Sequence, residues 1–183
     1  MGHPIHKLGY EHAWILTHTG RRFTPLQPVA ADIDIRDIAH ALSNVGRFAG
    51  HTHHFYSVAQ HSVHTSQIVA PENALAALLH DATEAYIADI ASPIKPFIDN
   101  YIDIEGRLWD CIADRYGLAR KLPAEVKQAD LVMLATERRD LMPDHPDEWP
   151  VLRGIQPLPM QINPLLPGAA KTLFLQRWKE LTQ

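Results

Sequence analysis

Cysteine is almost absent from this sequence: Cys111 stands alone, so no disulfide can form within the chain. A chain without disulfides is typical of a reducing compartment, where Cys111 serves as a small core residue. The N-terminal segment has no basic start followed by an apolar run, and no stretch reaches the roughly 18 apolar residues that a membrane span requires. These absences predict a cytoplasmic protein that does not bind a membrane.

Basic residues are also in deficit, because 17 Lys and Arg stand against 21 Asp and Glu and give a formal net charge of -4. This balance argues against nucleic acid as a partner, since attraction to the phosphate backbone needs a basic surface. A local basic pocket for a small anion remains compatible with it.

The length of 183 residues, with 46% hydrophobic and 21% charged residues, is ordinary for one globular domain. We expect a single domain over residues 1–183 with its core in about 30–142. A proline-rich arm over 143–168 and a C-terminal helix over 169–183 are expected to pack on this core.

Apolar residues recur at helical spacing through most of the chain. The pattern predicts helices that begin near residue 33, span 57–69, run from about 72 to the prolines at 93 and 96, span 97–116, and follow Pro123 and residue 169. The N-cap of the first is expected at Asp32 or Asp34, and Gly117 is expected to close the fourth. Near the start, AWIL and RRF flank THTG and predict a short β-hairpin that turns at Gly20. The predicted fold class is therefore all-α, a helical bundle with a short N-terminal β-hairpin.

The segment AALLHDATEAYIADI, residues 76–90, carries four acidic or histidine side chains on a largely apolar predicted helix: His80, Asp81, Glu84 and Asp89. Removing water from a carboxylate costs several kcal/mol unless a cation or hydrogen-bond donors replace it. A divalent cation would satisfy Asp81 and take the neutral imidazole of His80 as a second ligand. Two polar residues on other predicted helices are candidates to complete a site with open positions for water: His61 and Asp130.

Each of these residues also has an interpretation without a metal. His61 alone is more often a hydrogen-bonded core histidine, and Asp130 alone would complement the dipole of its helix. Glu84 alone would pair with Arg47 or Lys95. Buried polar positions on three helices together favour the metal site over these separate explanations.

In their order, an isolated His61, the adjacent pair His80 and Asp81, and the distant Asp130 resemble the signature of HD-domain metal-dependent phosphohydrolases. The flanking text, HDATEAYIADIASPIK and VKQADLVMLATERRDL, is similar to small bacterial and phage proteins related to 5'-deoxynucleotidases and phage dATP triphosphohydrolases. The similarity runs from about residue 20 to the C-terminus. It implies an HD-domain helical bundle in which His61, His80, Asp81 and Asp130 hold one divalent ion. Zn, Co, Mn, Ni or Fe would suit this donor set, and a second ion such as Mg would accompany a triphosphate substrate.

By the same resemblance, Glu84 orients or deprotonates the attacking water, and Asp89 relays a proton or holds a basic side chain. Asp89 has the alternative of a hydrogen bond at the helix end. Arg47, Lys95 and Lys127 match positions that face phosphate, although Lys95 and Lys127 are equally well explained as surface lysines.

The remaining histidines and one aromatic residue have open roles. His51, His53 and His54 either contribute to a substrate or second metal site or are polar loop residues, and His64 is a further candidate ligand. Trp149 and the proline-rich arm would close one side of a nucleobase pocket.

The function implied is a 5'-deoxynucleotidase that releases phosphate from deoxynucleoside monophosphates. The alternative within the same family is a triphosphohydrolase that releases nucleoside and tripolyphosphate. An alternative of another class is a nucleotide-binding module with a structural or vestigial metal site. The partner expected is a small nucleotide, and the apolar face of the 97–116 helix serves either a homo-oligomer or the core of a monomer.

Overall fold

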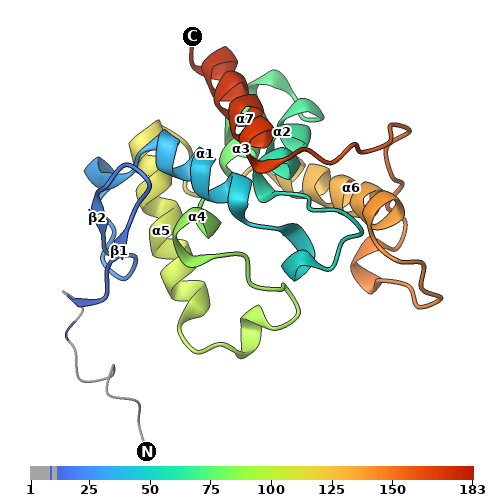
Figure 1. Ribbon diagram of the computed structural model, residues 1–183, viewed down its shortest axis with the longest axis horizontal. Coiled ribbons are helices and arrows are strands. Elements are labelled where there is room, and N and C mark those ends of the chain that lie inside the picture. Colours follow the sequence, from blue (N-terminus) through green and yellow to red (C-terminus); the bar gives the residue numbers. More distant parts are fainter. Residues whose placement is uncertain (1–8, 10–11) are drawn as a thin grey trace, which may run out of the picture.

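The computed structural model describes residue 9 and residues 12–183, which form helices α1 to α7 and one small hairpin (Figure 1). The helices are α1 (Ile35–Asn44), α2 (Val58–Gln67), α3 (Ala74–Leu79), α4 (Glu84–Ile87), α5 (Tyr101–Tyr116), α6 (Ala124–Leu141) and α7 (Pro167–Thr182). The strands are β1 (Ile15–Leu16) and β2 (Arg22–Phe23), which pair antiparallel. The predicted all-α class with an N-terminal hairpin is confirmed.

The hairpin turns where the sequence indicated, because Gly20 has a φ of 79°, which a glycine adopts without a steric penalty. Phe23 on β2 is buried and its ring stacks on that of Tyr86, with centroids 4.2 Å apart. This aromatic contact fixes the hairpin on the helical core.

The core lies between α1, α2, α3 and α7. Helix α7 crosses the other three in Figure 1, and it buries Ala170 and Phe174 against them. Its partners supply Ile38, Leu42 and other fully buried aliphatic side chains. Burial of this apolar face, rather than helix propensity, holds the short helices in place.

Helix ends follow the expected capping chemistry. The Asp34 carboxylate accepts a hydrogen bond from the backbone N–H of Arg36 and caps α1, while Ser57 caps α2 through the N–H of Gln60. Gly117 ends α5 in the left-handed conformation, with a φ of 68°. Asp34 is thus the N-cap rather than Asp32.

The single helix predicted from about residue 72 to the prolines at 93 and 96 is wrong. The chain forms α3, then a turn at 80–83, then the short α4. Backbone N–H groups there bond three residues back, from Ala82 to Leu79, from Glu84 to Asp81 and from Tyr86 to Thr83, at 2.9 to 3.0 Å. Such 3-10 bonding tightens the winding, so the helical ladder is interrupted where the polar residues lie.

Two further boundaries differ from the prediction. Helix α5 begins at Tyr101 instead of residue 97, because Asn100 adopts a left-handed φ of 62° and Lys95–Phe97 forms a separate 3-10 turn. Helix α7 begins at Pro167, a favoured residue for a first helical position, instead of residue 169.

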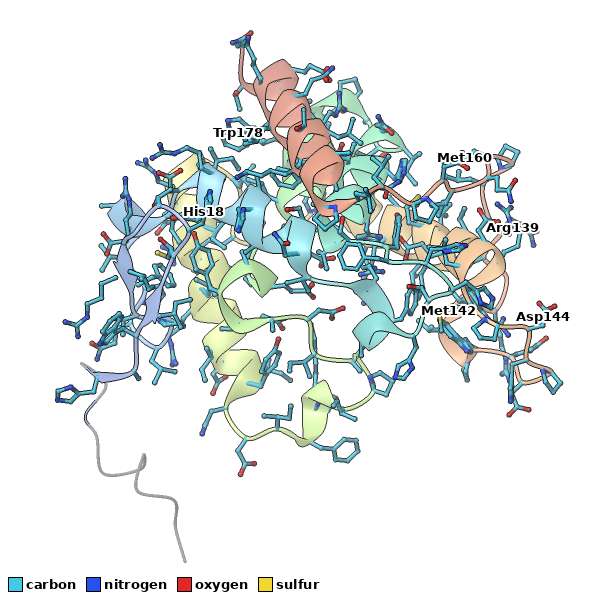
Figure 2. The ribbon with its side chains drawn as sticks, in the orientation of Figure 1. His18, Arg139, Met142, Asp144, Met160 and Trp178 are labelled. Atoms are coloured by element: carbon cyan, nitrogen blue, oxygen red, sulfur yellow. The ribbon has the colours of Figure 1, made fainter. Side chains whose placement is uncertain are left out.

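The proline-rich arm after α6 lies back along that helix. The Arg139 guanidinium donates to the carbonyls of Leu158 and Met160 at 2.6 Å each, and Asp140 accepts from the Ile162 N–H at 2.8 Å. Figure 2 shows Arg139 and Met160 at this end of the molecule. The arm is therefore held in a defined position along α6. Among the described residues, no helix is both long enough and apolar enough to cross a bilayer.

Candidate metal centre

Four side chains from three parts of the chain converge on one point. His61 comes from α2, His80 and Asp81 from the turn after α3, and Asp130 from α6. The Nε2 atom of His61 lies 3.3 Å from Nε2 of His80, 3.6 Å from Oδ2 of Asp81 and 3.2 Å from Oδ1 of Asp130. The Nε2 atom of His80 lies 3.3 Å from the same Asp81 oxygen and 3.9 Å from the Asp130 oxygen.

These separations match a shared ion. Two ligands that each lie about 2.1 Å from one ion must lie within about 4.2 Å of each other, and every distance above falls inside that limit. The group of His61, His80 and Asp130 can therefore hold a metal ion. Asp81, the fourth predicted donor, has an oxygen within this limit of both imidazoles but is not one of the three residues of that group.

The Nδ1 nitrogens of His61 and His80 both have hydrogen-bond partners. Nδ1 of His61 lies 2.5 Å from Oε1 of Glu137, and Nδ1 of His80 lies 2.7 Å from the backbone oxygen of Ala77. Because each Nδ1 donates its proton to an oxygen, each Nε2 can present a lone pair to the centre. The two imidazole nitrogens and the Asp130 carboxylate then lie close enough together to hold a cation.

The electrostatics also favour positive charge at this point. Burial and the nearby Arg47 cation oppose protonation of His61, but the carboxylates of Glu137 and Asp130 outweigh them and raise its pKa to about 10. Burial opposes ionisation of Asp130, yet its contacts with His61 and the charges of His80 and Arg47 lower its pKa. The cluster is thus built to stabilise a cation.

Glu137 is a site residue that the sequence analysis missed. It is fully buried on α6, and while Oε1 accepts from His61, Oε2 accepts from Nη2 of Arg47 at 3.0 Å and from Nε at 3.3 Å. It follows Asp130 by seven residues, which places the two on one helical face about two turns apart. That spacing was the available signal.

Arg47 is mostly buried beside the metal centre rather than exposed to solvent. Besides Glu137, it contacts Oδ2 of Asp81 at 3.5 Å, and only 12% of its side chain is exposed. Burial disfavours its charge, but the surrounding carboxylates outweigh burial and raise its pKa. The two residues after it, Phe48 and Ala49, adopt left-handed φ values of 54° and 51°, which cost free energy in non-glycine residues.

Glu84 opens α4 and is buried beside the centre. Its Oε2 atom has no hydrogen-bond partner, and its Oε1 atom lies 3.8 Å from Nζ of Lys95, which also contacts Glu105 at 2.9 Å. Burial, together with the charges of Asp81 and Asp89, raises the pKa of Glu84 well above its ordinary value. A carboxyl group of raised pKa is suited to acid–base chemistry.

Asp89 reaches the site through a strained backbone. Ala88, the residue before it, has a φ of 64° and a ψ of 163°, a conformation that is essentially restricted to glycine. Burial raises the pKa of Asp89 and the Asp81 charge raises it further, while Arg47 and Lys95 oppose the shift. Backbone strain therefore lies next to Arg47 and next to Asp89, two polar residues beside the metal centre. Strain of this kind is typical of a functional site.

A cavity of about 530 Å³ adjoins the centre. Arg47 and Asp89 lie in its lining, and the rest is largely apolar: Phe48, Ala49, Ala91, Ser92, Pro93, Leu134, Trp149, Pro150 and Val151. The Trp149 and Phe48 rings lie 5.9 Å apart between centroids. The cavity thus combines aromatic surface from the arm with charged groups beside the metal centre.

Comparison with known proteins adds a relationship but no activity. No family model matches the chain. The chain is 47% identical over 172 residues to the uncharacterized protein YfdR of Escherichia coli (strain K12), covering 93% of this chain and 97% of that protein. The chain belongs to the YfdR family. It is also 40% identical over 127 residues to the uncharacterized protein RCAP_rcc00048 of Rhodobacter capsulatus, which covers 64% of this chain and 65% of that protein.

Not every predicted residue lies at the centre of this YfdR-family chain. Lys127 lies one turn before Asp130 on α6, but its side chain is exposed and makes no described contact with the four donor residues. The backbone N–H of His53 donates to the Leu141 carbonyl at 2.9 Å, which ties the 51–54 loop to the end of α6. His64 has its Nε2 atom 3.4 Å from the Gln60 amide. Of the described histidines, only His61 and His80 place ring nitrogens in the candidate metal group.

Proposed function

We propose that this YfdR-family chain is an HD-domain phosphohydrolase that uses one divalent ion to hydrolyse deoxynucleoside 5'-monophosphates to nucleoside and phosphate. The observation that carries the proposal is the convergence of His61, His80, Asp81 and Asp130 beside the buried Glu84. When bound, a divalent ion supplies Lewis-acid activation of water and of a phosphate oxygen. Zn, Co, Mn, Ni and Fe are compatible with the mixed nitrogen and oxygen donors.

Glu84 is the group proposed to handle the proton. Its carboxyl has one oxygen near Lys95 and one buried oxygen without a hydrogen-bond partner, and the second is the one proposed to bind the attacking water. A carboxylate in this position accepts the proton of the attacking water as the new P–O bond forms. Its raised pKa allows it to hold that proton and then give it to the 5'-oxygen of the nucleoside as the old P–O bond breaks. Asp89, with a raised pKa of its own, is proposed to exchange protons with it.

Arg47 is proposed to position the phosphate. Its guanidinium has five N–H donors, and the contacts with Glu137 and Asp81 leave some of them for phosphate oxygens. Lys95, whose Nζ atom lies 3.8 Å from Oε1 of Glu84, adds a second cation. These two residues would neutralise charge that develops on the phosphoryl oxygens.

The adjoining cavity is proposed to hold the nucleobase. Its aromatic and proline surface would stack against a planar ring, while Arg47 and Asp89 mark the end nearest the reacting phosphate. Two of the three predicted phosphate-binding cations lie at the site and Lys127 is exposed. This distribution suits one phosphate better than a triphosphate chain, so the monophosphate is the preferred substrate class.

The test is an activity screen of chelator-treated protein with each divalent ion added back. Deoxynucleoside mono- and triphosphates are supplied in parallel, and nucleoside, phosphate and tripolyphosphate are measured separately. Metal-dependent release of nucleoside and phosphate from monophosphates would support the proposal. Tripolyphosphate as product would replace it by the triphosphohydrolase alternative, and binding without turnover with any ion would replace it by a nucleotide-binding module.

A further inference from the structure

A second cavity, of about 450 Å³, lies where the hairpin turn meets α1 and α7. Its lining consists of His18, Thr19, Arg21, Arg36, Lys171 and Leu175. Figure 2 shows His18 beside α1 at the hairpin end of the molecule, with Arg139 and Met160 at the opposite end. No lining residue is shared with the metal group or with the cavity beside it.

Lys171 carries an uncompensated charge in this cavity. Its Nζ atom lies 3.2 Å from Nε2 of His18 and 3.4 Å from Nδ1 of His40, and the two imidazole rings stack 3.7 Å apart and 7° from parallel. An ammonium only donates, so both ring nitrogens act as acceptors in this arrangement. Within the part of the chain that the structure describes, no carboxylate lies within ion-pairing distance of Lys171.

Two guanidiniums on the rim share a single carboxylate. Arg36 forms a two-pronged contact with Asp34 at 3.0 and 2.6 Å, and Arg21 lies 3.4 Å from the same residue while also donating to the Ala31 carbonyl. Both arginines are exposed and keep further N–H donors. The nearby Asp37 accepts hydrogen bonds from the N–H and hydroxyl of Thr19 and keeps its negative charge. Three cations, Lys171, Arg21 and Arg36, thus stand against two carboxylates, Asp34 and Asp37. The rim therefore has an excess of positive charge.

The titration behaviour of His40 agrees with this excess. Burial lowers the pKa of His40, and the neighbouring His18 and Lys171 lower it further by charge repulsion. A further proton is thus disfavoured at this place, whereas an anion would be stabilised.

We propose that this cavity binds the phosphate group of a small molecule, with Lys171, Arg21 and Arg36 as donors. The donors come from three elements, the hairpin, α1 and α7, and so approach from different directions, as the tetrahedral oxygens of a phosphate require. A planar carboxylate would satisfy fewer of them. Three cations against two carboxylates leave an excess of positive charge that an anion would balance. The inference is independent of the reaction proposed at the metal centre.

The test is a titration of the full-length chain with inorganic phosphate and then pyrophosphate, followed by the NMR ring signals of His18 and His40. Both rings contact Lys171, so they report on this cavity separately from the metal centre. We expect saturable shifts, and we expect Lys171→Gln to weaken binding about tenfold, the effect of losing one charged hydrogen bond. Lys179→Gln removes the same charge from an exposed position on the same helix and should leave the affinity unchanged.

Three results would overturn the inference: shifts that do not saturate, an equal loss of affinity in both lysine variants, or acetate binding as tightly as phosphate at equal ionic strength. Circular dichroism establishes that each variant is folded. If Lys171→Gln does not fold, Arg36→Gln serves instead, because 62% of the Arg36 side chain is exposed. An unchanged phosphate affinity in that variant would likewise contradict the assignment.

Discussion

The imidazole of His61 and the carboxylate of Glu137 lie 2.5 Å apart, between Nδ1 and Oε1, and neither side chain is exposed to solvent. The pair joins α2 to α6 and fixes which nitrogen of His61 faces the metal centre. Because the other oxygen of Glu137 holds Arg47, one buried carboxylate positions both a candidate metal ligand and the proposed phosphate-binding residue.

Glu137→Gln is therefore expected to weaken metal binding about 10- to 100-fold, the usual effect of losing the partner of a metal-binding histidine. The amide keeps the size of the side chain but loses its charge, so it holds His61 and Arg47 less firmly. Calorimetric titration of the chelator-treated variant with Mn or Zn measures the change. Glu148→Gln, which makes the same substitution at an exposed position in the arm, is the control. Equal metal affinity of both variants would contradict the role of Glu137.

Glu84→Gln should leave the metal bound and lower the turnover of deoxynucleoside monophosphates about 100- to 10,000-fold, the range for a general acid or base. The amide cannot accept a proton, but it fills the same space in the buried site. Glu105→Gln is the matched control, because Glu105 is the other carboxylate in contact with Lys95. Near-normal turnover in Glu84→Gln, with metal retained, would show that another group handles the proton.

The metal donors could be predicted from the sequence because each is a polar residue in an apolar helical setting. The sequence did not single out Glu137 as a buried residue of the site. It belongs to the charged run ERRD, residues 137–140, and such a run is typical of a solvated helix face. Only the packing of α2 against α6 shows that Glu137 points inward while Arg139 contacts the arm. Lys127 is exposed, so helical spacing from Asp130 did not by itself indicate how its side chain lies, and its predicted role in phosphate binding stays a prediction.

The backbone around the site was also hidden from sequence patterns. Residues 80–83 contain neither glycine nor proline, so nothing local indicated the break between α3 and α4. Nothing in the sequence around Ala88 indicated its positive φ. Tertiary contacts override local preference at both places, as is expected where a site requires a particular side-chain placement.

The pH dependence of stability should change when Asp34 is replaced. The contact with Arg36 lowers the pKa of Asp34 from 3.8 to about 2, although burial opposes the shift. Because the folded-state value is the lower one, its contribution is present above pH 3.8 and is lost as the pH falls through about 2. Asp34→Asn keeps a capping side chain and should lower the melting temperature at pH 7, with the difference from the parent chain disappearing near pH 2. A difference that stays constant down to that pH would exclude the ion pair as its cause.

Ala88→Gly should stabilise the fold and at the same time disturb the position of Asp89. Relief of the strained φ is worth about 1–3 kcal/mol, and the added freedom of glycine in the unfolded chain costs about 0.5–1 kcal/mol. The free energy of unfolding, measured by urea titration, should therefore rise by about 1 kcal/mol. Ala169→Gly, in an unstrained helical position of α7, should not increase it. Since Asp89 is the next residue, a freer residue 88 should lower turnover while stability rises. Opposite signs in the two measurements would show that the strain at Ala88 is retained to place Asp89, whereas unchanged turnover in a stabilised variant would show that Asp89 finds its position without it.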